Sequence, residues 1–457
     1  MSTNIQKNQI TEGIIWRQLL LFFFPILLGT FFQQLYNTID SVIVGQFVGK
    51  EALAAVGGSS AQIVAFVVGF FTGLSSGASV TIAQFFGAKD SRSANKGLHT
   101  AYAIAAFGGL ILTVSGIILT PFLLEMMNTP ADIVADSAVY LRIYFAGIIF
   151  VLIYNMGSAI LRATGDSKRP LYYLIVCCII NIVLDVLFVI VFHMGVMGVA
   201  VATLIAQAVS AVLVTLKLMR SEGILKLSVK QIRFHGSILK MQLKLGLPTG
   251  FEAILFSITN IAIQSAVNTF GTDTTAAWSA YGKLDAIFWM VSTAFGIAIT
   301  TFVGQNYGAG KMDRVRKSTR VCLLMDFIVS AVLVVFLIAA RFLLFRLFTN
   351  DSHVIEIGCD MLVLITPWYI VYVFIEVIAG ALRGVGNVVV PVAITLLGVC
   401  VLRIAWLAAM LKISPTISAI ILSYPVTWVI TALAFIIYYI YTVSYTHLRA
   451  HETKANL

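Results

Sequence analysis

The stretch LLLFFFPILL (Leu19–Leu28), followed by QQLYNTID (Gln33–Asp40), indicates the fold class. Both lie in one apolar run from Ile14 to Val48, whose length and hydropathy are typical of a membrane-spanning helix. Asp40 precedes Lys50 by ten residues, which places it roughly 15 Å inside that end of the helix. A carboxylate that faced lipid there would cost several kcal/mol, so Asp40 must face a protein-lined or hydrated interior. We therefore treat Asp40 as a candidate functional group, the alternative being a polar residue that only ties helices together.

The composition is that of a polytopic helical membrane protein. Of the 457 residues, 60% are hydrophobic and only 11% are charged, a balance that soluble globular proteins do not show. Residues 1–11 are polar and lack the apolar core and small-residue cleavage site of a signal peptide, so we expect the first apolar segment to be retained. The five cysteines lie in apolar segments without paired or metal-type spacing, and we interpret them as small hydrophobic residues.

Polar and Gly/Pro breaks divide the chain into twelve apolar segments, which predicts an all-α integral membrane protein. The predicted spans are 16–44, 52–84, 98–124, 132–161, 168–192, 195–219, 241–268, 274–305, 319–345, 354–382, 388–411 and 416–442. They predict an N-terminal six-helix bundle (1–219), a cytoplasmic linker (220–240) and a C-terminal six-helix bundle (241–443). The last stretch, 444–457, turns abruptly polar without periodicity, so we interpret it as a solvated tail or a non-native segment.

Basic residues alternate from loop to loop. With the N-terminus taken as cytoplasmic, Lys and Arg gather in the inner connections, above all between Lys217 and Lys244, while the outer connections hold few. This is the positive-inside rule, and it predicts a multi-pass protein with both termini in the cytoplasm. The net charge of +10 is then a topology signal, with some contact to anionic membrane lipid, and does not indicate a nucleic-acid partner.

Two motifs of the first half of the chain return in the second half, both in one register. Ala83–Asp90 (AQFFGAKD) returns as Gly304–Lys311 (GQNYGAGK), and Leu161–Asp166 (LRATGD) returns as Leu382–Asn387 (LRGVGN). Shared membrane composition would not place Gln-x-x-Gly-Ala and Leu-Arg-x-x-Gly twice in the same register. Because each copy holds six spans, the two bundles should be related by a pseudo-twofold axis along the membrane normal, with a binding cavity between or within them.

A second carboxylate, Asp185, lies in the fifth predicted span. It follows Asn181 by four residues, so the two share one helix face, and it precedes His193 by eight residues, which gives it a depth comparable to that of Asp40. Two close carboxylates in a membrane repel each other and attract a proton, and their oxygens also suit Na⁺. The residues alone leave H⁺ and Na⁺ both open, beside the alternative of an inert hydrogen-bonded pair. The polar residues expected in the same cavity are Tyr36, Asn155, Asn181 and Thr203.

The second half also carries ionisable residues inside its spans. The ones considered as interior groups are Glu252, Lys283, Asp285, Glu376 and Arg403. Because three of these residues are acidic and two are basic, we expect some of them to form ion pairs inside the protein. Glu252, which follows Pro248, is a candidate for substrate binding, although its closeness to Lys244 also suits a snorkelling or gating role.

Motifs of enzymes are missing from the sequence. Gly73-Leu74-Ser75-Ser76-Gly77 formally matches a nucleophile elbow, but without a strand–turn–helix context we interpret Gly73 and Gly77 as a helix-packing face. No Walker motif, His/Glu zinc pattern or dinucleotide fingerprint occurs. We expect no enzymatic activity and no cofactor.

Taken together, these residues resemble the multidrug and toxic compound extrusion (MATE) transporters over roughly residues 14–442. The resemblance rests on the twelve spans, on Gln-x-x-Gly-Ala after spans two and eight, and on Leu-Arg-x-x-Gly after spans four and ten. Asp40 matches the family's acid in the first span, and Asn181 and Asp185 match the Asn-x-x-x-Asp of span five in DinF-like members. Glu252 matches an acid of NorM-like members, whose further acid in span ten falls near Tyr372 here. Tyr36, Asn155 and Thr203 fit the neighbouring cavity positions.

The resemblance implies export of organic cations by alternating access, driven by inward flow of H⁺ or Na⁺ across a prokaryotic inner membrane. Asp40, Asp185 and Asn181 would couple the ion, with Asp40 and Asp185 as ligands if it is Na⁺. The partners would be cationic amphipathic small molecules and membrane lipid, and we expect a monomer. The residues expected to contact the exported molecule are Gln34, Tyr36, Asn155, Thr203 and Glu252.

Other functions fit the sequence less well. A flippase for a lipid-linked precursor, the main alternative, would need a broad cationic groove, whereas the central charges here lean acidic. A major-facilitator carrier would show a Gly-Asp-Arg-rich loop after span two, and a channel would need a ring of identical filter loops.

Overall fold

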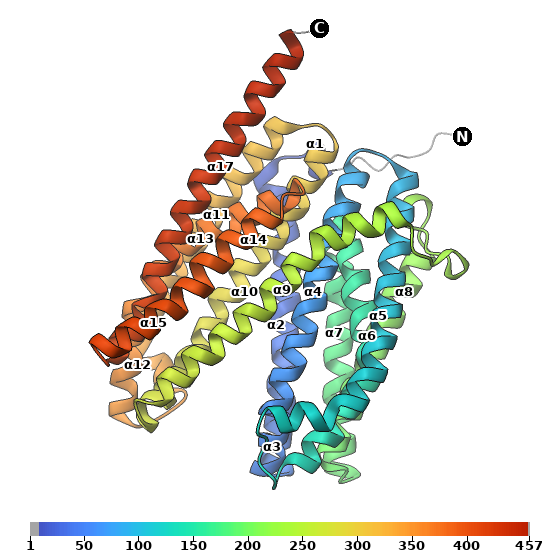
Figure 1. Ribbon diagram of the computed structural model, residues 1–457. Coiled ribbons are helices and arrows are strands. Elements are labelled where there is room, and N and C mark those ends of the chain that lie inside the picture. Colours follow the sequence, from blue (N-terminus) through green and yellow to red (C-terminus); the bar gives the residue numbers. More distant parts are fainter. Residues whose placement is uncertain (1–8, 456–457) are drawn as a thin grey trace. The chain divides into compact units, whose positions relative to one another are not determined.

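The computed structural model describes the backbone of residues 9–455 and the side chains of residues 10–442. Within this range the chain is helical and contains no strand (Figure 1). The all-α prediction is therefore confirmed. The α-helices are α1 (Gln9–Glu12), α2 (Ile15–Phe47), α3 (Lys50–Gly57), α4 (Ser59–Gly87), α5 (Ser91–Met126), α6 (Val134–Ala163), α7 (Lys168–Asp185), α8 (Gly195–Met219), α9 (Gly236–Asn268), α10 (Thr272–Gly308), α11 (Met312–Arg346), α12 (Ser352–Ile365), α13 (Tyr369–Gly384), α14 (Val389–Thr395), α15 (Leu402–Ile413), α16 (Ile417–Ile421) and α17 (Ser423–Ala455).

Twelve helical stretches of the described chain are long and apolar enough to cross a membrane, as predicted. The largest differences from the predicted starts occur at two equivalent helices, since α5 begins at Ser91 and α11 at Met312, each seven residues before the predicted span. Polar turns precede both apolar segments, and hydropathy detects only the apolar part of a helix. Asp90 caps α5 by accepting a hydrogen bond from the Ser93 N–H at 3.0 Å.

Several spans depart from regular α-helix. Asp185 is the last α-helical residue of α7, and a π-helical stretch, Val186–Val191, follows it directly. A second π-helical stretch, Leu396–Val401, lies between α14 and α15. The extra residue in a π turn rotates the side chains beyond it, and such turns are common at functional sites. The carboxylate of Asp185 therefore lies where the direction of its helix face changes.

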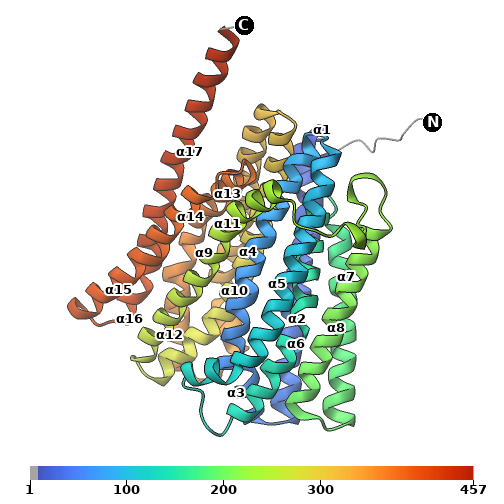
Figure 2. The same ribbon diagram turned by 45° about the vertical axis from the view of Figure 1, so that its right-hand side comes forward.

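The chain forms two compact units. The first unit is Leu20–Ala253 with Gly308–Gly310, and the second unit is the chain up to Leu19, Ile254–Tyr307 and everything from Lys311 onward. The division between the units falls inside α9, and the boundaries 1–219, 220–240 and 241–443 of the two bundles and their linker remain predictions. Within the first unit, α5 packs on α6, and α8 packs on both α6 and α7 (Figure 1, Figure 2).

The early part of α9 belongs to the first unit because it packs closely on α4. A Cβ added to Gly246 would lie 2.8 Å from the Leu74 Cα, and one added to Gly73 would collide with the backbone of Gly250. A Cβ added to Gly77 would meet the backbone of Gln242. Glycines at these positions let the two backbones touch, so the predicted packing face of Gly73 and Gly77 is confirmed.

The predicted linker is bound to α5. The Asn95 side-chain amide donates to the backbone carbonyls of Ile224 and Lys226, each at 3.1 Å. The Ser228 N–H donates to Nε2 of the buried His99 at 3.0 Å. These bonds anchor the linker along one helix of the first unit.

The two copies of the Leu-Arg-x-x-Gly loop share one backbone conformation. Gly165 and Gly386 have φ angles of 97° and 88°, values that favour glycine. In each loop the residue after the glycine donates its N–H to the carbonyl five residues earlier, at 2.9 Å in Leu161–Asp166 and 3.0 Å in Leu382–Asn387. This bonding ends a helix at the same point in both copies, which supports the repeat read from the sequence.

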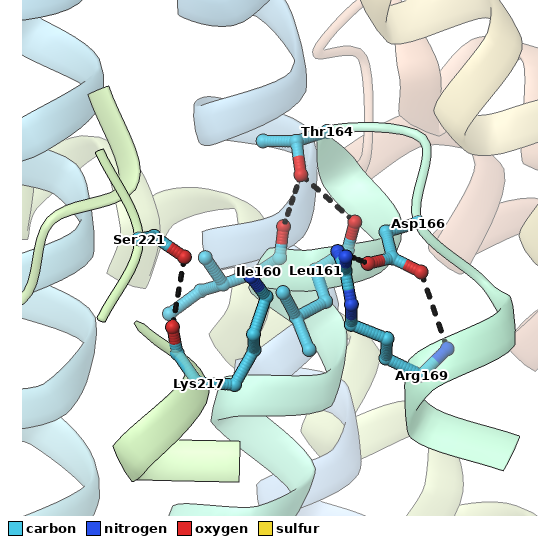
Figure 3. A network of polar contacts seen from close by, with 7 residues as sticks. All are labelled: Ile160, Leu161, Thr164, Asp166, Arg169, Lys217 and Ser221. Carbon is cyan, nitrogen blue, oxygen red and sulfur yellow. Dashed lines mark hydrogen bonds and ion pairs between the residues drawn. The ribbon is translucent and has the colours of Figure 1, made fainter. Parts of the chain in front are cut away.

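Side chains distinguish the two loops. In the first copy, shown in Figure 3, the Asp166 carboxylate accepts hydrogen bonds from the Arg169 N–H at 3.2 Å and from its guanidinium. In the second copy, the Asn387 amide donates instead to the Tyr438 hydroxyl at 2.6 Å. The same turn is thus held by an ion pair in one copy and by a neutral bond in the other.

Two further expectations concern the cysteines and the C-terminal stretch. All five cysteines are buried and free, as predicted. The predicted tail 444–457 begins within α17, which continues to Ala455, and the last two residues lie outside the described part.

Candidate functional site

Asp40 of α2 and Asp185 of α7 come together inside the first unit. The two residues are 8% and 0% exposed, and their carboxylates interact with each other. The side chains of Asn181 and Thr203 also lie within interaction distance of Asp40. Three helices, α2, α7 and α8, therefore bring four of the predicted site residues into one polar cluster.

The polar atoms of this cluster lack good hydrogen-bond partners in the described protein. The atoms concerned are Oδ1 of Asp40, both carboxylate oxygens of Asp185, Nδ2 and Oδ1 of Asn181, and Oγ1 of Thr203. Buried polar atoms normally find partners, and leaving one unpaired costs about 1–3 kcal/mol. A group of close, buried oxygens of this kind fits a proton or a small hard cation as the missing partner.

The cluster carries no compensating positive charge. The groups that act on the charge of Asp40 and Asp185 include no lysine or arginine, and neither carboxylate forms an ion pair within the described residues. Two buried carboxylates without a counter-charge cannot both remain ionised at low cost. The site is therefore built to attract a cation or a proton.

Aromatic side chains border the carboxylates. Tyr36 is buried about one helical turn before Asp40, and its hydroxyl accepts a hydrogen bond from Gln207 at 3.2 Å. The rings of Tyr140 and Tyr144 stack with their centroids 6.2 Å apart, and Tyr140 interacts with both carboxylates. These rings supply apolar and π surface beside the negative charge.

Sequence reasoning missed Tyr140, Tyr144 and Gln207. A usable signal exists for all three, because Tyr140 and Tyr144 are four residues apart and Gln207 follows Thr203 by four, which puts each pair on one helix face. The faces themselves could be recognised as inward-pointing only from the packing of α6 and α8.

The other predicted residues lie elsewhere. Asn155 is half-buried in α6 and makes no hydrogen bond within the described part of the chain. Gln34 is exposed, because two residues along a helix turn its side chain away from the direction of Tyr36. Glu252 is half-buried in α9 and is not among the groups that interact with Asp40 or Asp185. Roles for these three residues remain predictions.

The second unit has a polar centre of a different kind. Asp285 of α10 accepts hydrogen bonds from the Tyr281 hydroxyl at 3.3 Å, from Nε1 of Trp289 at 2.7 Å, and from the Tyr369 hydroxyl. The ring of Phe288 stacks on Tyr369 with centroids 3.9 Å apart. Asp285 is thus satisfied by three donors within an aromatic core.

Two basic residues of the second unit are also matched. The Arg383 guanidinium donates to Glu376 at 3.1 Å, which confirms that internal ion pairs occur in this half. The Arg403 guanidinium donates to the Thr427 hydroxyl at 3.0 Å and lies 4.0 Å from the Tyr424 ring centroid. Hydrogen bonding and a cation–π contact both stabilise this buried charge.

Comparison with known proteins identifies the family. The MatE family profile matches residues 25–187 and 248–408, one range in each half of the chain. The chain belongs to the MatE family. This MatE chain is 30% identical over 393 residues to the probable multidrug resistance protein YoeA of Bacillus subtilis (strain 168), with 84% of each chain covered. It is 27% identical over 420 residues to the probable multidrug resistance protein NorM of Thermotoga maritima, covering 89% of this chain and 88% of that one.

A solved structure shows the same fold. It is described as the outward-facing conformation of a multidrug resistance MATE family transporter of the MOP superfamily, and it matches with a TM-score of 0.90 at 20% identity. The match covers 97% of this chain and 99% of that chain. The MatE resemblance seen in the sequence is therefore confirmed, and the chain is a multi-pass membrane protein of a transporter family.

Proposed function

We propose that this MatE chain is a secondary active antiporter that exports cationic amphipathic small molecules in exchange for H⁺ or Na⁺. The observation that carries the proposal is the buried Asp40–Asp185 pair, which has unpaired oxygens and no basic partner. The names of the relatives, probable multidrug resistance proteins, support a drug-like substrate.

Coupling would follow from competition for one negative site. A proton or Na⁺ on the Asp40–Asp185 pair neutralises the charge that attracts a cationic drug, so binding of one weakens binding of the other. If the inward-open and outward-open states differ in affinity for the two ligands, their exchange drives alternating access. Tyr36, Tyr140 and Tyr144 would add cation–π contacts to an aromatic cation.

The setting we propose is a prokaryotic inner membrane, with both termini and the 220–240 linker in the cytoplasm. The support is the concentration of Lys and Arg in the linker and in the other inner connections. We propose a monomer that needs no cofactor, with H⁺ or Na⁺ as the coupling ion.

The test is transport of a fluorescent cation such as ethidium in inverted vesicles, under pH and Na⁺ gradients imposed separately. Wild type should move the cation under one of the two gradients, which identifies the coupling ion. Asp40→Asn should abolish the gradient-driven movement, because the neutral amide can neither take up and release a proton nor offer a negative charge to Na⁺. Glu125→Gln, at an exposed acid near the end of α5, is the matched control and should transport normally.

A different result would contradict the proposal. If correctly inserted wild-type protein moves no cation under either gradient, the drug-export proposal fails. The lipid-linked precursor flippase would then be the next function to test, in proteoliposomes that contain the labelled precursor.

A further inference from the structure

A groove of about 830 Å³ lies between the last turns of α11 and the helix α12, in the second unit. Its α11 side carries two guanidinium groups, Arg341 and Arg346, and its α12 side carries two carboxylates, Glu356 and Asp360. Glu356 and Asp360 are four residues apart and share one face of α12. Apolar residues, among them Phe342, complete the lining.

The four charged groups line this groove without pairing with one another. Within the described residues, none of the four forms an ion pair, although both signs are present in one groove. Arg341 donates to the Ile338 carbonyl at 2.8 Å, and its guanidinium lies 4.7 Å from the Phe342 ring centroid. Two basic and two acidic side chains therefore line one groove with their charges free to pair with a bound group that carries both signs.

The surroundings of the groove are those of lipid. Leu343, Leu347 and Val363 are 67%, 72% and 42% exposed. Apolar side chains exposed this far on a membrane-spanning protein are covered by acyl chains. Asp360 follows Asp351 by nine residues, so the charges reach roughly 13 Å along α12 from its capping residue. That depth covers the headgroup layer, which is roughly 5–8 Å thick in each leaflet, and the first part of the acyl region.

We propose that this groove binds a phospholipid whose headgroup carries both a phosphate and a primary ammonium, such as phosphatidylethanolamine. The planar guanidinium groups of Arg341 and Arg346 suit phosphate oxygens, which they can bind in pairs. Glu356 and Asp360 would accept hydrogen bonds from the ammonium, and the exposed apolar side chains would contact the acyl chains.

The same chemistry predicts what the groove rejects. A choline headgroup keeps the positive charge but has no N–H to donate to Glu356 and Asp360. An anionic phosphatidylglycerol headgroup brings no positive charge and would lie beside two unmatched carboxylates. Selectivity therefore comes from the acids, and binding strength comes mainly from the arginines.

The experiment is native mass spectrometry of the purified full chain with phosphatidylethanolamine, phosphatidylcholine and phosphatidylglycerol of identical acyl chains. Wild type should retain phosphatidylethanolamine about tenfold more tightly than the other two lipids. Arg341→Gln with Arg346→Gln should weaken retention of all three. Glu356→Gln with Asp360→Asn should reverse the selectivity in favour of phosphatidylglycerol, because the arginines then face an anionic headgroup alone.

The matched control is Lys412→Gln, which removes an exposed charge from the last turn of α15 outside the groove. Each variant is checked for folding by its thermal unfolding, and the single variants Arg341→Gln and Asp360→Asn replace any double variant that does not fold. Equal retention of the three lipids by wild type, or unchanged selectivity after removal of the acids, would overturn the proposal. Because the readout is lipid binding, its failure is distinct from any failure of the antiport proposal.

Discussion

Corresponding positions at the centres of the two units carry different chemistry. In the register of the repeated loops, Thr203 of α8 corresponds to Tyr424, and Gln207 corresponds to Trp428, both of α17. In the first unit Thr203 lies beside the Asp40 carboxylate, and Gln207 donates to the Tyr36 hydroxyl. In the second unit the corresponding residues contribute to a core of aromatic rings, with Tyr424 and Trp428 centroids 5.5 Å apart. The two copies thus place corresponding residues on corresponding helices, but the residue types at these positions differ.

The acids differ as well. Asp185 corresponds to Trp406, so its carboxylate has no counterpart in the second unit. The second unit has buried acids of its own. Three donors contact Asp285, and Asp326 of α11 accepts a hydrogen bond from the Ser330 hydroxyl at 3.2 Å but keeps one oxygen unpaired, whereas neither oxygen of Asp185 has a hydrogen-bond partner among the described residues. An unsatisfied buried acid is costly unless a ligand binds it, and a satisfied one contributes to stability. The contrast supports the proposal that the coupling ion binds at the Asp40–Asp185 pair and that Asp285 stabilises the fold.

The largest effect expected from this comparison is that of Asp185→Asn on transport. Gradient-driven efflux of ethidium should fall on the order of a hundredfold, because the site can no longer exchange charge with the coupling ion. The thermal unfolding midpoint of the purified protein should stay the same or rise, since an unmatched buried acid has been removed. Efflux at the wild-type rate in this variant would show that the ion binds elsewhere.

The next effect is that of Asp285→Ala on stability. This substitution removes the acceptor oxygens that the Tyr281 hydroxyl, the Tyr369 hydroxyl and the Trp289 N–H contact. One of the two hydroxyls can then donate to the other, 2.9 Å away, so one hydroxyl and the Trp289 N–H are left without an acceptor. The free energy of unfolding should fall by about 3 kcal/mol, while efflux per folded molecule persists. Thermal unfolding of purified protein and efflux normalised to inserted protein measure the two quantities.

Asp285→Asn is the control for that measurement. It keeps an acceptor oxygen for the two tyrosines, so it should cost only about 1 kcal/mol. If instead Asp285→Asn keeps full stability and loses efflux, Asp285 belongs to a transport site, and the contrast between the two units is wrong.

A smaller effect concerns the Glu376–Arg383 ion pair, whose side chains are 20% and 17% exposed. Glu376→Gln and Arg383→Gln should each lower the free energy of unfolding by about 2 kcal/mol. The double variant should lose less unfolding free energy than the two single variants lose together, because the second substitution removes a side chain that the first has already left without its partner.

The first unit provides the control for this cycle. In the same register, Asn155 corresponds to Glu376 and Arg162 corresponds to Arg383, so the arginine there faces an uncharged position. The cycle of Asn155→Ala and Arg162→Gln should give a coupling energy near zero. A strong coupling energy between Asn155 and Arg162 would show that these two side chains interact as Glu376 and Arg383 do, although Asn155 is uncharged.

Much of this architecture could be predicted from sequence, for identifiable reasons. Twelve apolar segments are an unambiguous signal, since a bilayer demands long runs, and acids inside them are rare enough for Asp40 and Asp185 to stand out. Hydropathy could not detect that α5 and α11 extend into polar turns. Which face of α6 points inward depends on packing, so Tyr140 and Tyr144 were not recognised. Gln34 is exposed while Tyr36 and Asp40 of the same helix are buried, which shows that closeness along a helix does not imply a shared face.

The smallest effect is expected in the repeated loops, where Asp166→Asn gives the first loop the residue of the second. The ion pair with Arg169 is lost, and because those side chains are 21% and 49% exposed, the free energy of unfolding should fall by less than about 1 kcal/mol. The loss should shrink further in concentrated salt, which screens exposed charges. Asn387→Ala is the control, since it removes the neutral bond to the Tyr438 hydroxyl without changing any charge, and its effect should not depend on salt. A loss at Asp166 that is independent of salt, or that exceeds the range of an exposed ion pair, would mean that the side-chain bond to the backbone N–H of Arg169, and not the ion pair, holds this turn.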